Sequence, residues 1–203
     1  MTCVISLNCP LTPTMTFGDN STRKCVSFCS NNEWGDPFSR NCVAQCPNVT
    51  DTGISTSYGD STTGQYLCVV ICPTLPRLFG DNATNLCVSE CPALTFGDQT
   101  GNRSCVPQCP LLNTTYYYAQ NDSRICVLIC KAGTWGYQTT RECVEDPFNC
   151  STQWADNTTH LCVDTCPVTA NTYGDNDTRI CVPTCPTGTF ADGLSRICVA
   201  RCP

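Results

Sequence analysis

A short pattern of apolar and polar positions recurs along the chain. An aromatic residue is followed by Gly or Ala and, in most cases, by Asp, as in FGDN at 17–20, YGDN at 173–176 and FADG at 190–193. In eight of ten cases a Cys-Val pair begins eight residues after the aromatic, whereas the spacing from the preceding cysteine varies from four to twelve. Gly-Asp and Asp-Asn dipeptides favour tight turns. The pattern predicts a repeated β-hairpin with one defined turn and one adaptable arm.

No stretch has helical apolar periodicity long enough for a real helix. We expect each aromatic ring to cover the disulfide of its own small unit. An arginine stands two residues before the closing cysteine and could lie along the ring, meet the Asp of its own turn, or be a solvated charge. It recurs at Arg23, Arg40, Arg103, Arg124, Arg141, Arg179 and Arg196.

The cysteine content changes the picture of the core. The chain has 22 cysteines in 203 residues, in eleven pairs, nine of which read C-V-x-x-C. This density marks a disulfide scaffold and an oxidising compartment, so we predict a secreted or cell-surface protein. Leu, Ile, Val and Phe number only 40, which is too few to order the chain through one core.

Two regular pairings are open to these cysteines. Closing each C-V-x-x-C on itself would enclose three residues and leave the fixed aromatic spacing without a purpose. We prefer bonds from the last cysteine of one pair to the first of the next, which close loops of 11 to 21 residues, each stabilising by about 3 kcal/mol. This scheme predicts Cys9–Cys25, Cys29–Cys42, Cys46–Cys68, Cys72–Cys87, Cys91–Cys105, Cys109–Cys126, Cys130–Cys143, Cys150–Cys162, Cys166–Cys181 and Cys185–Cys198.

The preferred pairing leaves Cys3 and Cys202 without a partner in the chain. We expect both to form inter-unit disulfides, either head to tail with a second copy or with a continuation of the same polypeptide. The first residues do not resemble a signal peptide. We therefore expect a processed form or a piece of a longer array.

Asparagine sequons suggest covalent glycans. Nine N-x-S/T triplets occur, and five stand three residues after the aromatic, at the expected hairpin tip. The competing interpretation is turn-forming asparagine with incidental threonine. Asn149 is the weakest site because its middle residue is Cys150. We predict N-glycosylation at Asn20, Asn48, Asn82, Asn102, Asn113, Asn121, Asn157 and Asn176.

Charge and chemistry exclude several functions. A net charge of −6 argues against nucleic acid, and no apolar run is long enough for membrane insertion. The C-x-x-x-C spacing does not suit zinc, and Asp175 and Asp177 favour a turn over a calcium loop. The only histidine, His160, occupies an arginine slot of the repeat. We predict no metal, no cofactor and no enzymatic activity.

The stretches CVSECPALTFGDQTGNRSCVPQCP at 87–110 and CVPTCPTGTFADGLSRICVARCP at 181–203 carry a family resemblance. They resemble the furin-like, growth-factor-receptor cysteine-rich repeats, especially those of the repetitive extracellular surface proteins of ciliates and other protists. The resemblance covers almost the whole chain. It implies single-disulfide modules joined by C-V-x-x-C-P linkers and stacked into an extracellular rod.

We predict a small disulfide-rich fold: an extended, solenoid-like rod of about ten tandem single-disulfide β-hairpin modules of about 17–26 residues. Residues 1–203 form one continuous array, with little or no helix and no large hydrophobic core. The expected function is that of an extracellular structural glycoprotein in a filament or cell-surface coat. The alternative is the stalk or ligand-binding ectodomain of a cysteine-rich receptor or adhesin, which residues 47–67 or the three tyrosines at 116–118 would favour.

Overall fold

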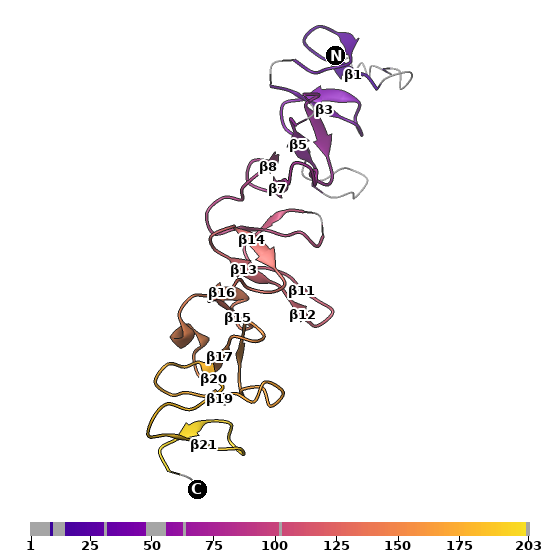
Figure 1. Ribbon diagram of the computed structural model, residues 1–203. Helices are drawn as coiled ribbons and strands as arrows, with labels where there is room; N and C mark the ends of the chain where they lie inside the picture. Colours follow the sequence, from indigo (N-terminus) through magenta and orange to yellow (C-terminus); the bar gives the residue numbers. More distant parts are fainter. Residues whose placement is uncertain are drawn as a thin grey trace. The chain divides into compact units, whose positions relative to one another are not determined.

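The chain forms two compact units, Met1–Val106 and Pro107–Pro203, in the computed structural model (Figure 1). The structure describes residues 9, 15–30, 32–47, 56–62, 64–101 and 103–201. Each unit is built from short antiparallel hairpins. The described residues contain one short 3-10 helix, η1 (Pro147–Cys150), and otherwise strands and turns.

The described residues of the first unit form five hairpins. They are β1 (Phe17–Asp19) with β2 (Lys24–Val26), β3 (Trp34–Asp36) with β4 (Asn41–Val43), β5 (Tyr58–Asp60) with β6 (Leu67–Val69), β7 (Phe79–Asp81) with β8 (Leu86–Val88), and β9 (Phe96–Gly97) with β10 (Cys105–Val106).

The second unit repeats this arrangement and adds one hairpin. Its repeated hairpins are β13 (Tyr118–Gln120) with β14 (Ile125–Val127), β15 (Trp135–Tyr137) with β16 (Glu142–Val144), β17 (Trp154–Asp156) with β18 (Leu161–Val163), β19 (Tyr173–Gly174) with β20 (Cys181–Val182), and β21 (Phe190–Ala191) with β22 (Cys198–Val199). The added hairpin pairs β11 (Leu111–Leu112) with β12 (Thr115–Tyr116).

The register of each hairpin follows from its sequence. In the first hairpin Phe17 lies opposite Val26 and Gly18 lies opposite Cys25. Aromatic and β-branched residues favour strands and pair well across them, and the strand period of two puts Gly and Cys on the other face. The aromatic faces Val and the Gly or Ala faces Cys in all ten repeated hairpins, which explains why Val follows the first cysteine throughout.

All ten predicted disulfides are confirmed. Their Cα–Cα distances are 5.4–5.7 Å, which lies near the centre of the usual range. Each bond closes one hairpin, so we number the modules by their disulfides, from module 1 (Cys9–Cys25) to module 10 (Cys185–Cys198). Cys3 and Cys202 lie outside the described residues.

Within each unit, consecutive hairpins join through parallel pairing. The sheet of the first unit runs β2-β1-β4-β3-β6-β5-β8-β7, and single bridges such as Gly80 to Ser104 continue the pattern. In the second unit β13 pairs with β16 and β15 with β18. Both units are therefore ladders in which each module pairs with its neighbours in sequence, as the fold prediction held.

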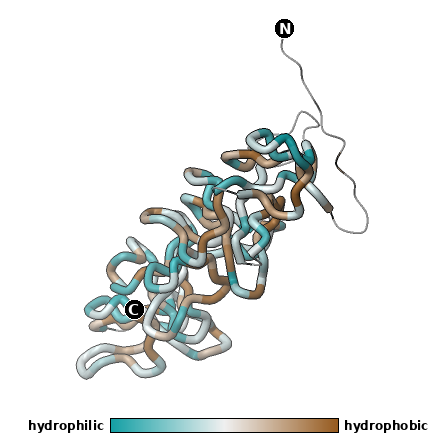
Figure 2. The backbone as a smooth tube through the Cα atoms, turned by 90° about the horizontal axis from the view of Figure 1, so that it is seen from above, coloured by the Kyte–Doolittle hydropathy of each residue, from teal (hydrophilic) through white to brown (hydrophobic). Residues whose placement is uncertain are grey.

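The packing corrects one expectation. Five buried aromatic rings cluster with the disulfide of the following module and not with that of their own, as Phe17 of module 1 does with Cys29 and Cys42. The other four are Tyr58, Tyr118, Trp135 and Trp154. Figure 2 shows the apolar residues spread along the backbone tube. The described residues thus form a series of small clusters, because a ring covers more apolar surface when it bridges two modules than when it folds back on one.

Glycine allows this bridging. A Cβ added at Gly35 would lie 2.7 Å from the Phe17 ring, and one at Gly80 would lie 2.4 Å from the Tyr58 ring. Such distances are too short for a real carbon contact, so the ring lies flat on bare backbone. A small residue at this position of the repeat, Gly at most junctions, is therefore favoured by packing at the junction in addition to the turn.

Gly174→Val tests this packing preference. The new side chain would meet the Trp154 ring, since a Cβ at this position lies 2.6 Å from it. We expect a loss of about 1–3 kcal/mol in unfolding free energy, the usual cost of overpacking, with a shift in Trp fluorescence. Gly193→Val is the matched control because nothing lies within 4 Å of its added Cβ. Equal denaturation midpoints for the two variants would contradict ring-on-glycine packing.

Candidate functional site

The junction between consecutive modules is the feature that every repeat contributes to the fold. Its first element is a hydrogen bond between backbones. The N–H that follows the aromatic donates to the carbonyl two residues before the next closing cysteine, as from Gly18 to Arg40 and from Gly174 to Arg196, both at 2.8 Å. The same bond occurs at all eight junctions inside the two units, at 2.7–2.9 Å.

The accepting residue has an unusual backbone. It adopts a φ of 50–59° in all ten modules, whether it is Arg, Tyr66, Asn85 or His160. Left-handed geometry is uncommon for residues other than Gly. Here it ends a five-residue turn whose N–H to C=O bond, such as Arg40 to Asp36 at 2.8 Å, closes the hairpin. The turn aims the carbonyl at the preceding module.

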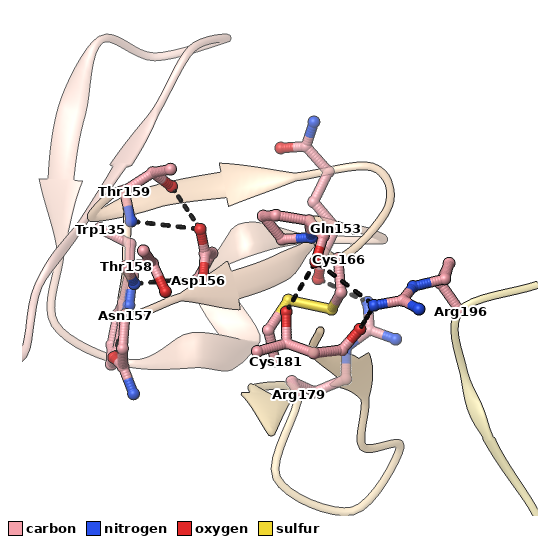
Figure 3. Close-up of a disulfide and its surroundings, with 12 residues drawn as sticks. Trp135, Gln153, Asp156, Asn157, Thr158, Thr159, Cys166, Arg179, Cys181 and Arg196 are labelled. Atoms are coloured by element: carbon pink, nitrogen blue, oxygen red, sulfur yellow. Dashed lines mark hydrogen bonds between the residues drawn. A yellow bond between two sulfur atoms is a disulfide. The ribbon is translucent and has the colours of Figure 1, made fainter. Parts of the chain in front are cut away.

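The arginine side chains strengthen the junction. The guanidinium carbon of Arg179 lies 4.6 Å from the centre of the Trp154 ring, and that of Arg196 lies 4.2 Å from Tyr173. Figure 3 shows both arginines around the Cys166–Cys181 disulfide. The Nη2 groups of Arg179 and Arg196 also donate to the carbonyls of Gln153 at 3.1 Å and Thr172 at 2.7 Å.

Arg103 is placed in the same way over Phe79, at 5.2 Å. In each of these cases the ring belongs to the preceding module. The expectation that arginine lies along an aromatic ring is confirmed at these three junctions, although the ring is not that of its own hairpin. Cation–π contacts of this kind stabilise by about 0.5–2 kcal/mol.

The hairpin tip is organised by the aspartate of the repeat. Asp156 accepts from the N–H groups of Thr158 and Thr159 at 3.1 Å and from the Thr159 hydroxyl at 2.6 Å (Figure 3). Such side chain to backbone bonds are typical of Asp turns. Asp156 is almost fully buried, and its hydrogen bonds compensate for that burial.

The tip geometry accounts for part of the sequon pattern. The hydroxyl residue of four in-register sequons bonds the preceding Asp: Thr22, Thr84, Thr159 and Thr178. Ser195 makes the same bond in module 10, where Gly193 stands in place of the asparagine. The Ser or Thr of these triplets therefore has a structural role in the turn whether or not the asparagine is glycosylated. Glycosylation is needed to account for the asparagine alone.

The tip asparagines are nevertheless accessible. The sequon asparagines that are exposed within the described residues are Asn20, Asn82, Asn113, Asn121, Asn149, Asn157 and Asn176. Asn48 and Asn102 lie outside those residues. The side-chain oxygens of Asn82 and Asn157 accept from Tyr58 Oη at 2.7 Å and Trp135 Nε1 at 3.1 Å. A glycan on Nδ2 leaves that oxygen available, so the contact and the modification are compatible.

The other candidate residues, Asp175, Asp177 and His160, take part in the turns and junctions of the repeat. Asp175 accepts from the Asp177 N–H and the Thr178 hydroxyl, and no group of three His, Cys, Asp or Glu able to hold a metal occurs in the described part of the chain. The His160 carbonyl accepts from Gly136 at 2.8 Å, as arginine does elsewhere. In the same part of the chain no helix has the length and apolarity to cross a membrane.

The sequence did not predict which residues form a hollow at modules 3 and 4. Tyr66 and Asn85 replace the repeat arginine in modules 3 and 4, and with Trp34 they line a hollow of about 380 Å³. The sequence signal was present, since both positions break the arginine pattern. The sequence itself points only to the loop that contains Tyr66, residues 47–67, because that loop is the longest. The other irregular segment forms β11 and β12, with Tyr116 stacked near Tyr118 at 6.5 Å.

Comparison with known proteins adds no family. No protein-family model, no curated protein and no solved structure matches this chain. The geometry of its own modules is therefore the basis for the function proposed below.

The tip aspartates predict a response to acid. Hydrogen bonds from the hydroxyls of Ser21 and Thr22 lower the pKa of Asp19 from 3.8 to about 2. A lowered pKa means that this carboxylate stabilises the fold above pH 3.8, and that the stabilisation is lost as the pH falls through 3.8 toward 2. Hydroxyl and backbone donors from Ser195 and Leu194 lower the pKa of Asp192 as well.

Carboxyl ¹³C chemical shifts recorded against pH would measure the effect. We expect an Asp19 midpoint near 2, and Asp19→Asn should remove this share of the acid-dependent loss of stability. A midpoint at or above 3.8 would contradict the tip geometry.

Proposed function

We propose that this protein is an extracellular structural glycoprotein, and that its disulfide-linked modules form part of a filament or a cell-surface coat. The observation that carries the proposal is the sameness of the junction. All eight junctions within the two units use the same backbone hydrogen bond. Because each module contacts mainly its neighbours, such an array can be lengthened without redesign.

The disulfides give the array a mechanical property suited to this role. An extended chain spans about 3.5 Å per residue, so a 17-residue repeat such as 25–42 would reach about 60 Å without its cross-link. With the cross-link, load passes along the linker from Cys25 to Cys29, about 14 Å, and then across the 5.6 Å between Cys29 and Cys42. The disulfide therefore limits the extended length of the repeat to about a third of its length without the cross-link.

Compartment and partners follow from the same features. Ten disulfides in 203 residues fit a secreted or surface protein. Covalent glycans on the exposed tips would keep the array soluble and resistant to proteases. The array would be lengthened either by head-to-tail association of copies or by continuation of one polypeptide. In both cases Cys3 and Cys202 would form the disulfides to residues outside this copy of the chain.

The alternative function is a stalk or ligand-binding ectodomain of a surface receptor or adhesin. One observation favours it, namely the hollow at Trp34, Tyr66 and Asn85, where two successive modules lack the repeat arginine. A binding module needs such an exceptional place, whereas a filament needs equivalent repeats.

Electron microscopy of the native material separates the two functions. We expect continuous fibres or a regular coat that disassembles when disulfides are reduced. Isolated, unbranched particles of single-chain length would overturn the filament and favour the stalk.

Glycan attachment has its own test. Intact glycopeptide mass spectrometry of the secreted protein should find glycans on most of Asn20, Asn82, Asn121, Asn157 and Asn176. Asn82→Gln should remove one glycan while the Thr84 hydroxyl still bonds Asp81, so the fold should be retained. Unmodified peptides at all five sites would mean that these triplets serve the turn alone.

A further inference from the structure

The arginine series is interrupted in modules 3 and 4, and the interruption changes the surface. Tyr66 and Asn85 have the backbone of the arginines they replace, with φ of 51° and 55°, and their carbonyls make the same junction bonds to Gly35 and Gly59 at 2.8 Å. The fold is therefore unaltered here. What changes is the side chain, and Tyr66 and Asn85 both line a hollow of about 380 Å³.

Two aromatic rings form one wall. Trp34 and Tyr66 have ring centres 5.5 Å apart and planes inclined by 57°. One surface of Trp34 rests on Gly59, while Tyr66 is 42% exposed. An exposed ring of this kind offers a flat apolar surface that suits the C–H face of a ligand ring.

The remaining wall is polar but carries no charge. Asn32, Gln45, Thr84 and Asn85 line the hollow, with no Asp, Glu, Lys or Arg among the lining residues. The side chains of Asn32 and Gln45 are exposed, and their amides can both donate and accept hydrogen bonds. The hollow therefore suits a neutral ligand whose polar groups also donate and accept.

We propose that this hollow binds a neutral saccharide. A sugar ring presents an apolar C–H face to the aromatic wall and hydroxyl groups, which can donate as well as accept, to the amides. A proline-rich peptide also fits aromatic grooves, but its exposed polar groups are mostly carbonyl acceptors, which leave the amide oxygens of Asn32 and Gln45 without a donor. The uncharged, amide-rich wall favours the sugar.

The size and surroundings agree with a short oligosaccharide. The volume lies at the lower end of the about 300–1,000 Å³ typical of ligand sites. A second hollow of about 200 Å³ shares Asn32 and Tyr66 with the first, so Tyr66 stands between two spaces that adjacent sugar units could occupy. The inference does not require that the protein form filaments.

Two sources could supply the sugar. Thr84, which lines the hollow, is the hydroxyl residue of the Asn82 sequon, so a glycan on Asn82 of the same chain is one source. A glycan on another molecule is the other. The chemistry of recognition is the same for both.

The repeat itself supplies the test variants. Tyr66→Arg and Asn85→Arg each restore the residue of a regular module, at a backbone geometry that arginine adopts elsewhere in the chain, so both should fold. His160→Arg makes the same replacement in the second unit and is the matched control. The probes are chitobiose, cellobiose and mannobiose at millimolar concentration, with Trp fluorescence and saturation-transfer NMR as readouts.

We expect at least one disaccharide to bind the wild type or Asn82→Gln protein, at least tenfold weaker binding to Tyr66→Arg and Asn85→Arg, and no change in His160→Arg. Tighter binding to Asn82→Gln than to the glycosylated wild type would identify the chain's own glycan as the occupant, and equal binding would point to another molecule. No binding to Asn82→Gln, binding unchanged in Tyr66→Arg, or selective binding of a proline-rich peptide would overturn the proposal.

Discussion

The structure depends on an aromatic ring lying flat on the glycine of the next module. Phe17 on Gly35 and Tyr58 on Gly80 show the geometry, which a single added methyl group would obstruct. The contact brings the ring onto the following disulfide, sets the strands of the two hairpins at pairing distance and places the neighbouring arginine over the ring. Ala155 takes the glycine position beneath Trp135 without loss of burial, so the smallest side chain is also tolerated where the surroundings adjust.

This contact explains how so little apolar sequence orders two hundred residues. No module could bury its ring alone, because a hairpin with a loop of 11 to 21 residues has only one apolar face. A ring that packs on the next disulfide, as Phe17, Tyr58, Tyr118, Trp135 and Trp154 do, serves two modules at once. The cross-links lower the entropy of the unfolded chain, and the buried tip aspartates, such as Asp19 and Asp156, make the short turns rigid. Stability is therefore local and additive along the ladder.

The proposed functions follow from the uniform junction between modules and from the two successive modules that lack the repeat arginine. A uniform junction suits a load-bearing array whose extension is limited by its disulfides. The replacement of arginine by Tyr66 and Asn85 leaves the backbone of the ladder intact and changes only the chemistry of its surface. An array can thus acquire a binding site at a chosen module without a cost to its fold, because the junction hydrogen bond uses the carbonyl and is indifferent to the side chain.

The sequence by itself determined the module and its hairpin and favoured one set of ten disulfides, and it predicted small clusters in place of one large core, as the described residues show. These features are local or nearly so: the spacing from Phe17 to Cys25 decides the turn, and the pairing joins cysteines that are neighbours along the chain. The tertiary structure alone decided which disulfide each ring covers and which ring each arginine covers, since the spacing in the sequence favours Cys25 for Phe17 whereas the ring packs on Cys42. The choice depends on the close approach of two backbones at Gly35, and the left-handed turn at Arg40 permits that approach. The hollow beside Tyr66 has the same origin, because three modules must meet before its wall exists.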